Sequence, residues 1–461
     1  MKNILYLTTF SLFLIYLSSS IAISDSYHNV EEIQKNKLID KILHNLETSI
    51  TIEEEWIIET KEGHTQKLET LIHPEMELKL PFGFDLTSIV RFRLDAVDNL
   101  EHGDSSQSEI SPASRRGIIG DRIEFELREF YFEKYINNIY LKVGKQQIVW
   151  GNSDGLKVLD IVNPQDFREF IYDEWDDSRI PLWTVNVEIP LKNWLMQLIW
   201  IPDKTYHKIP EPNSTFSFTS PMIVSKPPPG VKLNINSIQR PKRFFSDSDM
   251  GIRFSRFWSG WDITLNYLYH YDDVPVPFSK VSFSHIIPEV NVSPSFKRSH
   301  MVGGTFSNAF GNLVIRGELG HSFNKYFVVN DRNNRKGVVE ADEFSYVLGF
   351  DWSGIENTFL SLQLFQGIIT NSPSGLIRDQ VETNISFYVS HDFFNTLLHT
   401  EFIWLQNLNK GDGFFQPRIS YQMRDEMILK TGFDLFYGGS NGLFGQFDNN
   451  DRFILAIEFG L

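Results

Sequence analysis

The sequence predicts an all-β protein: a transmembrane antiparallel β-barrel of about 18 strands, with 16 as the alternative count. Apolar and polar residues alternate with a period of two from about residue 49 almost to the end of the chain, as in strands with one apolar and one polar face. Tight turns alternate with generally longer loops along this region. The last ten residues also have the pattern of a strand. An outer-membrane barrel accounts for all three observations.

The first 48 residues precede this pattern and form two segments. Residues 1–22 have the charged start, short apolar core and small-residue exit of a secretory signal peptide, and we expect cleavage after Ala22. Residues 23–48 form a periplasmic segment, in which charged and apolar residues alternate at helical spacing from Val30 to Leu46. This spacing predicts a short amphipathic helix, and a poorly packed leader is the alternative. The outer-membrane β-barrel is expected to occupy residues 49–461.

Individual strands are separated by turn residues, and the lengths of the links carry most of the argument. Short links such as Ile136-Asn137 and Ser259-Gly260 alternate with long ones such as 150–181 and 203–247. This asymmetry predicts short periplasmic turns and long extracellular loops, with both chain ends on the periplasmic side. The predicted strands are 51–59, 67–80, 85–95, 121–135, 138–149, 182–190, 194–202, 248–258, 261–272, 295–307, 312–323, 342–352, 357–367, 381–391, 396–406, 413–422, 427–437 and 452–461.

The terminal strand shows the alternation most clearly. Large hydrophobic residues take every second position from Phe453 to Leu461, while Arg452 and Glu458 lie on the other face. A soluble domain seldom leaves such an apolar edge unpaired, whereas a closed barrel pairs it with the first strand and turns its apolar face to lipid. The alternative is an edge strand of a β-sandwich. We therefore expect Phe453, Leu455, Ile457 and Phe459 to face lipid, and Arg452 and Glu458 to face inward.

Three strands contain an irregularity. Pro74 and Pro417 each remove one donor from a ladder of hydrogen bonds, which predicts a bulge or a local break. The apolar phase also shifts around Arg128-Glu129, and this shift predicts a bulge.

Charged residues on the faces opposite the apolar ones are candidates for the lumen wall. A polar wall of mixed charge fits a water-filled channel, or a channel partly filled by salt bridges. Mutual pairing that stabilises the wall is the alternative role for most of these residues. The pore-lining candidates are Arg91, Arg93, Glu124, Glu126, Arg128, Lys142, Arg253, Asp262, Arg316, Glu318, Glu401 and Arg418.

The third outward loop, from Trp150 to Pro181, carries too many hydrophobic residues for a loop exposed to water. We expect it to fold into the barrel and to set the narrowest point of the pore, while a simple lid over the mouth is the alternative. Its charged residues are expected near Arg91, Arg93 or Arg128. The constriction-loop candidates are Asp160, Arg168, Asp173, Asp176, Asp177 and Arg179.

The segment that leads into this loop has the most distinctive sequence in the chain. It resembles an uncharacterised family of Gram-negative outer-membrane barrels marked by a Gly-[Lys/Arg]-Gln-x-x-x-Trp-Gly segment and a following Asn-Pro, and it is more loosely similar to alginate-export barrels. The resemblance implies a porin-like outer-membrane protein without a settled substrate. Leu461 departs from the Phe with which such barrels usually end. The matching residues are Gly144, Lys145, Gln146, Trp150, Gly151, Asn163 and Pro164.

Composition narrows the chemistry. The chain has no cysteine, which excludes disulfides and cysteine-ligated metals, and its net charge of -16 makes nucleic acid an improbable partner. The acidic turn Asp448–Asp451 offers oxygen ligands for Ca²⁺, but a polar turn is the favoured interpretation. Ser153 lies in a Gly-x-Ser-x-Gly pattern. A serine in this pattern acts as a nucleophile only on a strand–turn–helix element of an α/β sheet, and the predicted barrel contains no such sheet. We expect no catalytic residue, metal or cofactor.

The function expected from the sequence is an outer-membrane channel for passive passage or export of small hydrophilic solutes. A sealed barrel acting as a surface-exposed binding or structural protein is the alternative, and a barrel-borne hydrolase is the third candidate. The expected partners are outer-membrane lipid and the barrel-assembly machinery. A homo-oligomer is compatible with the sequence, which does not identify the solute.

Overall fold

The computed structural model describes residues 44–101, 107–170, 175–224, 230–282, 288–331, 334–371 and 373–461. The chain divides into two units, Met1–Leu46 and Glu47–Leu461, and the barrel belongs to the second. The predicted signal peptide and almost all of the predicted periplasmic helix lie outside the described residues. No helix within these ranges is long and apolar enough to cross a membrane.

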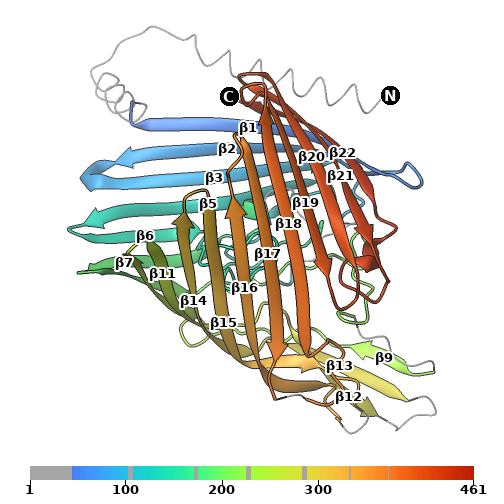
Figure 1. The fold of residues 1–461 in the computed structure, drawn as a ribbon. Coiled ribbons are helices and arrows are strands. Elements are labelled where there is room, and N and C mark those ends of the chain that lie inside the picture. Colours follow the sequence, from blue (N-terminus) through green and yellow to red (C-terminus); the bar gives the residue numbers. More distant parts are fainter. Residues whose placement is uncertain are drawn as a thin grey trace, which may run out of the picture. The chain divides into compact units, whose positions relative to one another are not determined.

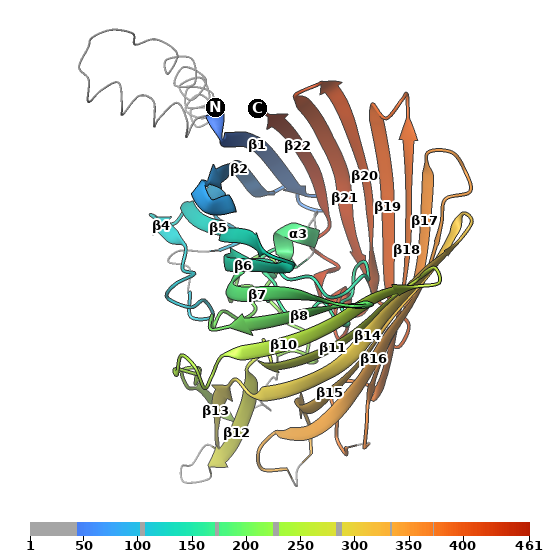
Figure 2. The ribbon, with the colours of Figure 1, turned by 90° about the vertical axis from the view of Figure 1, so that its left-hand side faces the viewer.

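Eighteen antiparallel strands close a barrel, which confirms the predicted fold (Figures 1 and 2). Neighbours along the chain pair with one another, apart from the places where a small extra strand intervenes. The barrel strands are β1 (Leu46–Glu59), β2 (Thr65–Leu80), β3 (Phe84–Asp95), β5 (Ile123–Ile136), β6 (Ile139–Gln146), β7 (Leu182–Leu191), β8 (Trp194–Ile201), β10 (Asp249–Trp258), β11 (Trp261–Tyr271), β14 (Arg298–Phe310), β15 (Leu313–Val328), β16 (Val338–Trp352), β17 (Thr358–Ile369), β18 (Val381–Phe393), β19 (Leu398–Asn407), β20 (Gly413–Arg424), β21 (Met427–Tyr437) and β22 (Arg452–Gly460).

The seam between the first and last strands closes the barrel. β1 and β22 pair over nine successive positions, from Thr51↔Gly460 to Glu59↔Arg452. Along β22, Arg452, Ile454 and Ala456 are buried and alternate with partly exposed hydrophobic residues, so the two predicted faces of this strand are present. The seam leaves neither strand with an open edge in lipid, where an unpaired backbone group costs several kcal/mol.

Four short strands lie outside the barrel's ladder of 18. β4 (Gly117–Ile119) pairs with the outward end of β5. β12 (Val276–Ser282) and β13 (Glu289–Ser295) form a hairpin, and β9 (Lys232–Ile235) adds to β13 in parallel. This three-stranded sheet is built from two long loops and lies beyond the end of the wall (Figure 2).

The predicted irregularities take two forms. In the β3–β5 ladder, Ile89↔Glu129 is followed by Val90↔Leu127, so Arg128 is the extra residue of a bulge, as predicted. At Pro74, pairing stops after Ile72↔Phe92 and resumes at Glu75↔Ile89 in the same register, which is a local break. The β20–β21 ladder skips the position of Pro417 in the same way.

One strand is shorter than its sequence pattern. Alternation predicted a strand over 138–149, but β6 ends at Gln146 and the chain then turns into the barrel. β5 continues seven residues beyond its last pair with β6, Phe130↔Lys145, toward the outward rim. β6 therefore extends less far toward the extracellular side than β5, and the chain leaves the sheet at this point.

We predict that a charge on the lipid-facing side of the wall destabilises the barrel and that the same charge on the lumen-facing side does not. Leu362 in β17 faces outward with 44% of its surface exposed, and Leu362→Arg should lower the free energy of unfolding by about 2–4 kcal/mol if it lies near the bilayer midplane. The matched control is Ser390→Arg in β18, which lies opposite Glu401 on the inner face. Urea unfolding in lipid vesicles measures both, and equal losses would contradict the assignment of faces.

Candidate functional site

Three motif residues direct the chain from β6 into the lumen. Gly144 has a φ of +141°, and a Cβ added there would lie 2.1 Å from the Phe130 carbonyl oxygen, so only glycine fits. Lys145 Nζ donates to the Leu127 carbonyl (2.7 Å) on the stretch of β5 that β6 does not reach. Gln146 Nε2 donates to the Thr184 carbonyl (3.0 Å) on β7. The Lys145 side chain thus takes the place of a ladder hydrogen bond to β5, and the Gln146 side chain fixes the end of β6 to β7.

The other motif residues hold the two ends of the inward loop, residues 147–181, together. Asn163 Oδ1 accepts from the Ile148 N–H (2.7 Å), and its Nδ2 donates to the Ile180 carbonyl (2.9 Å). The Pro164 carbonyl accepts from the Ile180 N–H (2.8 Å). Trp150 is fully buried and donates through its indole N–H to Gln197 Oε1 (2.8 Å) on the wall. The residues of the predicted motif therefore fix the base of this loop.

The first half of the inward loop docks on β14 and β15. Glu318 accepts hydrogen bonds from the backbone N–H groups of Asn152 and Leu159, the latter at 3.0 Å. Leu159 is fully buried, and a Cβ added to Gly303 would lie 2.5 Å from its Cδ2. The Gly151 backbone is equally close to Asp160, where an added Cβ would lie 2.8 Å from the Asp160 nitrogen. Small residues on both surfaces allow this approach.

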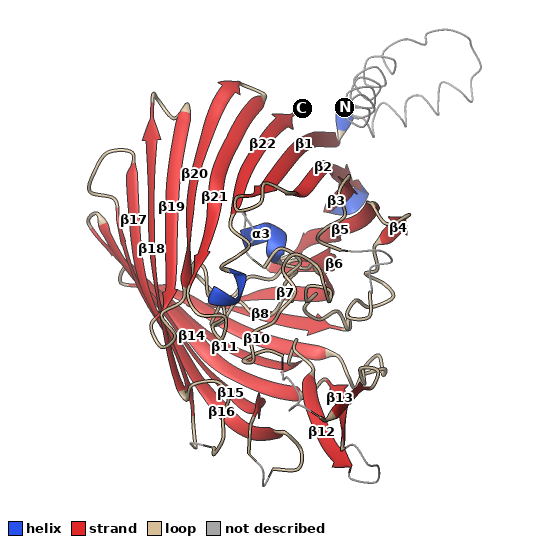
Figure 3. Ribbon diagram, turned by 90° about the vertical axis from the view of Figure 1, so that its right-hand side faces the viewer, coloured by secondary structure: helices blue, strands red, loops and turns tan. Residues whose placement is uncertain are grey.

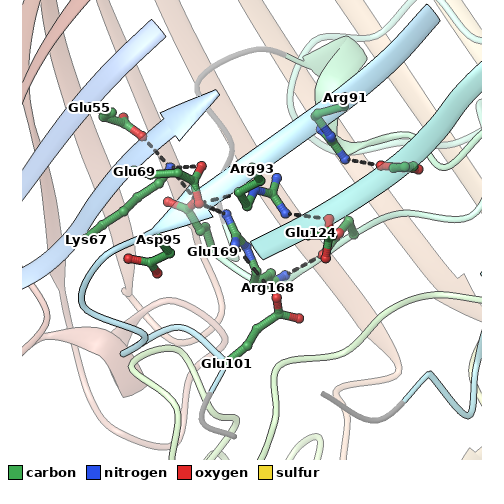
Figure 4. Close-up of polar contacts among 12 residues, drawn as sticks. Glu55, Lys67, Glu69, Arg91, Arg93, Asp95, Glu101, Glu124, Arg168 and Glu169 are labelled. Carbon is green, nitrogen blue, oxygen red and sulfur yellow. Dashed lines mark hydrogen bonds and ion pairs between the residues drawn. The ribbon is translucent and has the colours of Figure 1, made fainter. Parts of the chain in front are cut away.

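The second half lies against the opposite side of the barrel, where Figure 3 shows α3 inside the ring of strands and Figure 4 shows Arg168 and Glu169 among residues of β1, β2 and β3. Arg168 Nη2 lies 3.0 Å from Glu69 Oε2 on β2. Glu169 is held by two strands, because its Oε1 lies 2.8 Å from Lys67 Nζ and its Oε2 lies 2.9 Å from Arg452 Nη1 of β22. Lys67 also pairs with Glu55 on β1. The loop is thus tied across the barrel seam.

A second set of ion pairs joins the loop to β3 and β5. Arg91 and Glu126 are cross-strand partners 2.6 Å apart, and Arg93 and Glu124 are the next such pair at 3.1 Å. Arg116, from the loop before β4, connects them to the inward loop. Its guanidinium lies 2.8 Å from Asp166 and 3.2 Å from Glu124.

Asp177, in the short helix α3 (Trp175–Ser178), reaches the same basic surface. Its carboxylate lies 3.5 Å from Arg128 and 3.8 Å from Arg91. The expectation that loop acids lie near these arginines therefore agrees with the position of Asp177. Asp173 lies outside the described residues, and nothing is described of the side chain of Asp176.

The protonation of the loop's acids follows from these pairs. Burial alone would raise the pKa of Glu169, but the charges of Lys67, Arg452 and Arg168 hold it well below its usual range. The pKa of Asp177 is also lowered. Burial raises it, but the charges of Arg128 and Arg91 together have the larger effect. Buried carboxylates that stay ionised in this way depend on their cationic partners.

Aromatic side chains fill the outward side of the lumen near β20–β22. Phe170 of the inward loop lies 4.6 Å, between ring centroids, from Phe447. Phe216, from the loop between β8 and β10, is fully buried and lies 5.5 Å from Phe447. Phe436 and Phe444 join them in one aromatic cluster. Three loops distant in the sequence thus meet inside the mouth.

The other predicted site residues are distributed around the inner wall. Lys142 lies over the Tyr131 ring at 3.5 Å, and Arg253 donates to the Val149 carbonyl at 3.2 Å. Asp160 lies 2.8 Å from Arg179 within the loop. The remaining ones have these contacts: Arg316 with Asp154 and Asp351, Glu401 with the Tyr388 hydroxyl, Arg418 with Asp434, and Asp262 exposed opposite Phe257 in the β10–β11 ladder.

Several members of the charge network were not among the sequence candidates. Glu55, Lys67 and Glu69 alternate on the inner faces of β1 and β2 and are buried. Their period-two spacing was a usable signal, because three ionisable residues on the polar face of two adjacent strands must line the lumen. Arg116 and Phe216 come from long loops, and no periodic pattern marked them.

These observations define a closed antiparallel β-barrel of 18 strands, with one loop folded into its lumen. The chain belongs to the family described as "Protein of unknown function (DUF1302)", whose model matches residues 83–441. The predicted resemblance to an uncharacterised barrel family is confirmed at that level, and the motif as its signature stays a prediction. Among curated proteins, none matches the sequence.

Solved structures share the fold at low sequence identity. Acinetobacter baumannii OccAB2 is 10% identical with a TM-score of 0.50, over 91% of this chain and 98% of that chain. Pseudomonas aeruginosa OccK1 (OpdK) is 11% identical with a TM-score of 0.50, over 91% and 99%. Pseudomonas aeruginosa OccK2 (OpdF), solved in complex with glucuronate, gives the same four values.

We predict that Glu169 contributes to stability in a pH-dependent way. Its pKa is lower in the folded protein than the ordinary value of 4.5, so its contribution is complete above that value and is lost as the pH falls below it. Glu169→Gln should lower the free energy of unfolding at pH 7 by about 3 kcal/mol, because it leaves buried cations short of a partner. The difference from the unchanged protein should shrink at pH 3.

Glu77→Gln is the matched control, since Glu77 is an exposed residue at the other end of β2. Urea unfolding at pH 7 and pH 3 measures all three proteins. A Glu169→Gln effect that is the same at both pH values would contradict the ionic role.

Proposed function

We propose that this protein is a passive outer-membrane channel for small hydrophilic solutes, with the inward loop as its constriction. The observation that carries the proposal is the position of that loop inside a closed barrel. Its first half contacts Glu318 on β15, and its second half contacts Glu69 on β2 and Arg452 on β22. A segment tied to opposite walls occupies part of the lumen's cross-section at that level.

The inner wall is polar over part of its surface. Away from the charged network, the inner faces of β7, β11 and β14 carry the buried residues Thr184, Asn186, Thr264, Asn266 and Thr305. Leu182, Leu268 and Met301 on the same faces pack against the inward loop. The channel proposal therefore rests on the closed barrel with a mixed polar interior, whereas the lipid-facing sides of the same strands are apolar. Charges in the network are mostly paired, so a solute passing the loop meets ion pairs of both signs.

One observation favours a second candidate, a sealed barrel that acts as a surface-exposed binding or structural protein. The aromatic cluster joins the inward loop to the loop that contains Phe216 and to the last loop, which contains Phe447. Packed rings of this kind exclude water on that side of the mouth. The cluster lies beside β20–β22, and the channel proposal places the path on the side of the lumen away from it.

A barrel-borne hydrolase has less support. Ser153 Oγ donates to the Leu156 carbonyl within the inward loop (2.9 Å). His399 pairs with Asp392 (2.6 Å) on the inner wall of β18 and β19, far along the chain from Ser153. A nucleophile needs a base within hydrogen-bond reach, and the described hydrogen bonds of Ser153 do not include a histidine.

We predict ohmic conductance for the protein in planar bilayers, and a larger single-channel conductance after deletion of residues 156–176. The deletion removes the part of the loop that crosses the lumen, and the cations and carboxylates left on the wall become hydrated. The matched control shortens the β12–β13 hairpin, which lies outside the barrel's ladder and should leave conductance unchanged.

The outcomes separate the candidates. Unchanged conductance in the deletion variant would show that the inward loop does not constrict the path. Conductance in the deletion variant alone would favour the sealed barrel, and no conductance in either folded protein would overturn the channel. Shifted migration of unheated samples in gel electrophoresis verifies that each barrel is folded.

A further inference from the structure

A rigid turn lies on the outer side of the barrel just before β10. We call residues 241–248 the outer hook. The Asp247 carboxylate accepts hydrogen bonds from the backbone N–H groups of Lys242 (3.0 Å) and Arg243 (2.8 Å). Ser248 Oγ donates to the Phe245 carbonyl (2.6 Å), and Arg298 of β14 donates to the Ser248 carbonyl (2.9 Å). The turn is thus fixed both internally and to the wall.

The outer hook places two phenyl rings beside a tryptophan of the wall. Phe245 stacks on Trp200 of β8, with centroids 6.0 Å apart and planes inclined by 15°, and Phe244 meets the same indole edge-on at 5.6 Å. The Trp200 indole N–H donates to Ser248 Oγ (2.8 Å). The side chain of Phe244 is nevertheless 57% exposed, and that of Phe245 is 74% exposed. A rigid turn that exposes two large apolar rings needs an apolar surrounding to be stable.

The neighbouring residues of the wall show where these rings lie along the barrel axis. Trp200 is the ladder partner of Met250, Met250 of Tyr269, and Tyr269 of His300, so one row runs across β8, β10, β11 and β14. Ile199 and Ile201 are buried on the inner side of β8, which places Trp200 on the outward face. Three of its four residues, Trp200, Tyr269 and His300, have aromatic rings, and such rings near the extracellular end of the strands are typical of the membrane interface.

Two cations are attached to the same turn. Lys242 is exposed, and the side chain of Arg243 is 79% exposed. Arg243 Nη2 donates one hydrogen bond to Asp247 Oδ1 (3.3 Å), while the two backbone N–H groups donate to Oδ2. The guanidinium therefore keeps most of its donors for an anion outside the protein. Apolar rings and basic groups in one turn match a ligand with acyl chains and an acidic headgroup.

We propose that the outer hook binds a phosphorylated lipid of the outer leaflet. Phe244 and Phe245 insert among its acyl chains, and Lys242 and Arg243 bind the phosphate of its headgroup. A soluble phosphate would satisfy the two cations, but it would leave the exposed rings in water. This proposal needs only the membrane barrel and is independent of whether the lumen conducts.

The test is a titration of the full-length, folded barrel in detergent with bisphosphorylated lipid A, followed by native mass spectrometry. The double variant K242Q/R243Q should bind this lipid at least about tenfold more weakly, since each cation near an anionic headgroup contributes on the order of 1 kcal/mol. The matched control is K192Q/R424Q, which removes one cation from the β7–β8 turn and one from the end of β20, both at the other end of the barrel. Its affinity should equal that of the unchanged protein.

A second lipid and a second variant separate charge from apolar contact. For lipid A without its phosphates, K242Q/R243Q and the unchanged protein should bind equally. F244S/F245S should weaken binding of both lipids. Equal affinities of K242Q/R243Q and the unchanged protein for the phosphorylated lipid would overturn the proposal, as would an equal loss for both lipids.

Discussion

The pairing of β1 with β22 is the constraint on which the rest of the molecule depends. In hydrocarbon every backbone N–H and C=O needs a partner within the protein, and a sheet meets this requirement only when it has no edge. The nine paired positions from Thr51 to Glu59 provide that closure. Once the sheet is closed, the alternation along each strand divides all side chains between lipid and lumen, and the polar residues collect inside.

The inward loop shows how the wall tolerates an interruption. Where β6 leaves the ladder, Lys145 donates to the Leu127 carbonyl, which a longer strand would have paired, and Gln146 donates to the Thr184 carbonyl on β7. Gly144 permits the close approach to β5 that this exit requires. The motif predicted from the sequence includes these residues, and their contacts are structural. They explain the motif without assigning it a role in binding a solute.

The fold was predictable from the sequence because its signal is local and repeated. Each strand carries its own period of two, and the predicted number of strands matched the barrel despite the breaks at Pro74 and Pro417. The loop's burial was also predictable, since residues such as Leu159 and Val162 are too apolar for water. Its partners were not. Glu169 meets Lys67 and Arg452 only in three dimensions, and Phe216 reaches Phe447 across more than half of the chain. Such contacts depend on how loops cross the lumen, and strand periodicity carries no information about that path.

The ion pair between Glu169 and Arg452 links the loop to the closure of the barrel. Arg452 belongs to the last strand, and Asp434 of the preceding strand lies 2.5 Å from its Nε. The site that receives Glu169 is therefore complete only when β22 pairs with β1, because Lys67 lies on β2 and Arg452 on β22. A change that opens the seam would separate these two cations and remove one of the anchors of the loop.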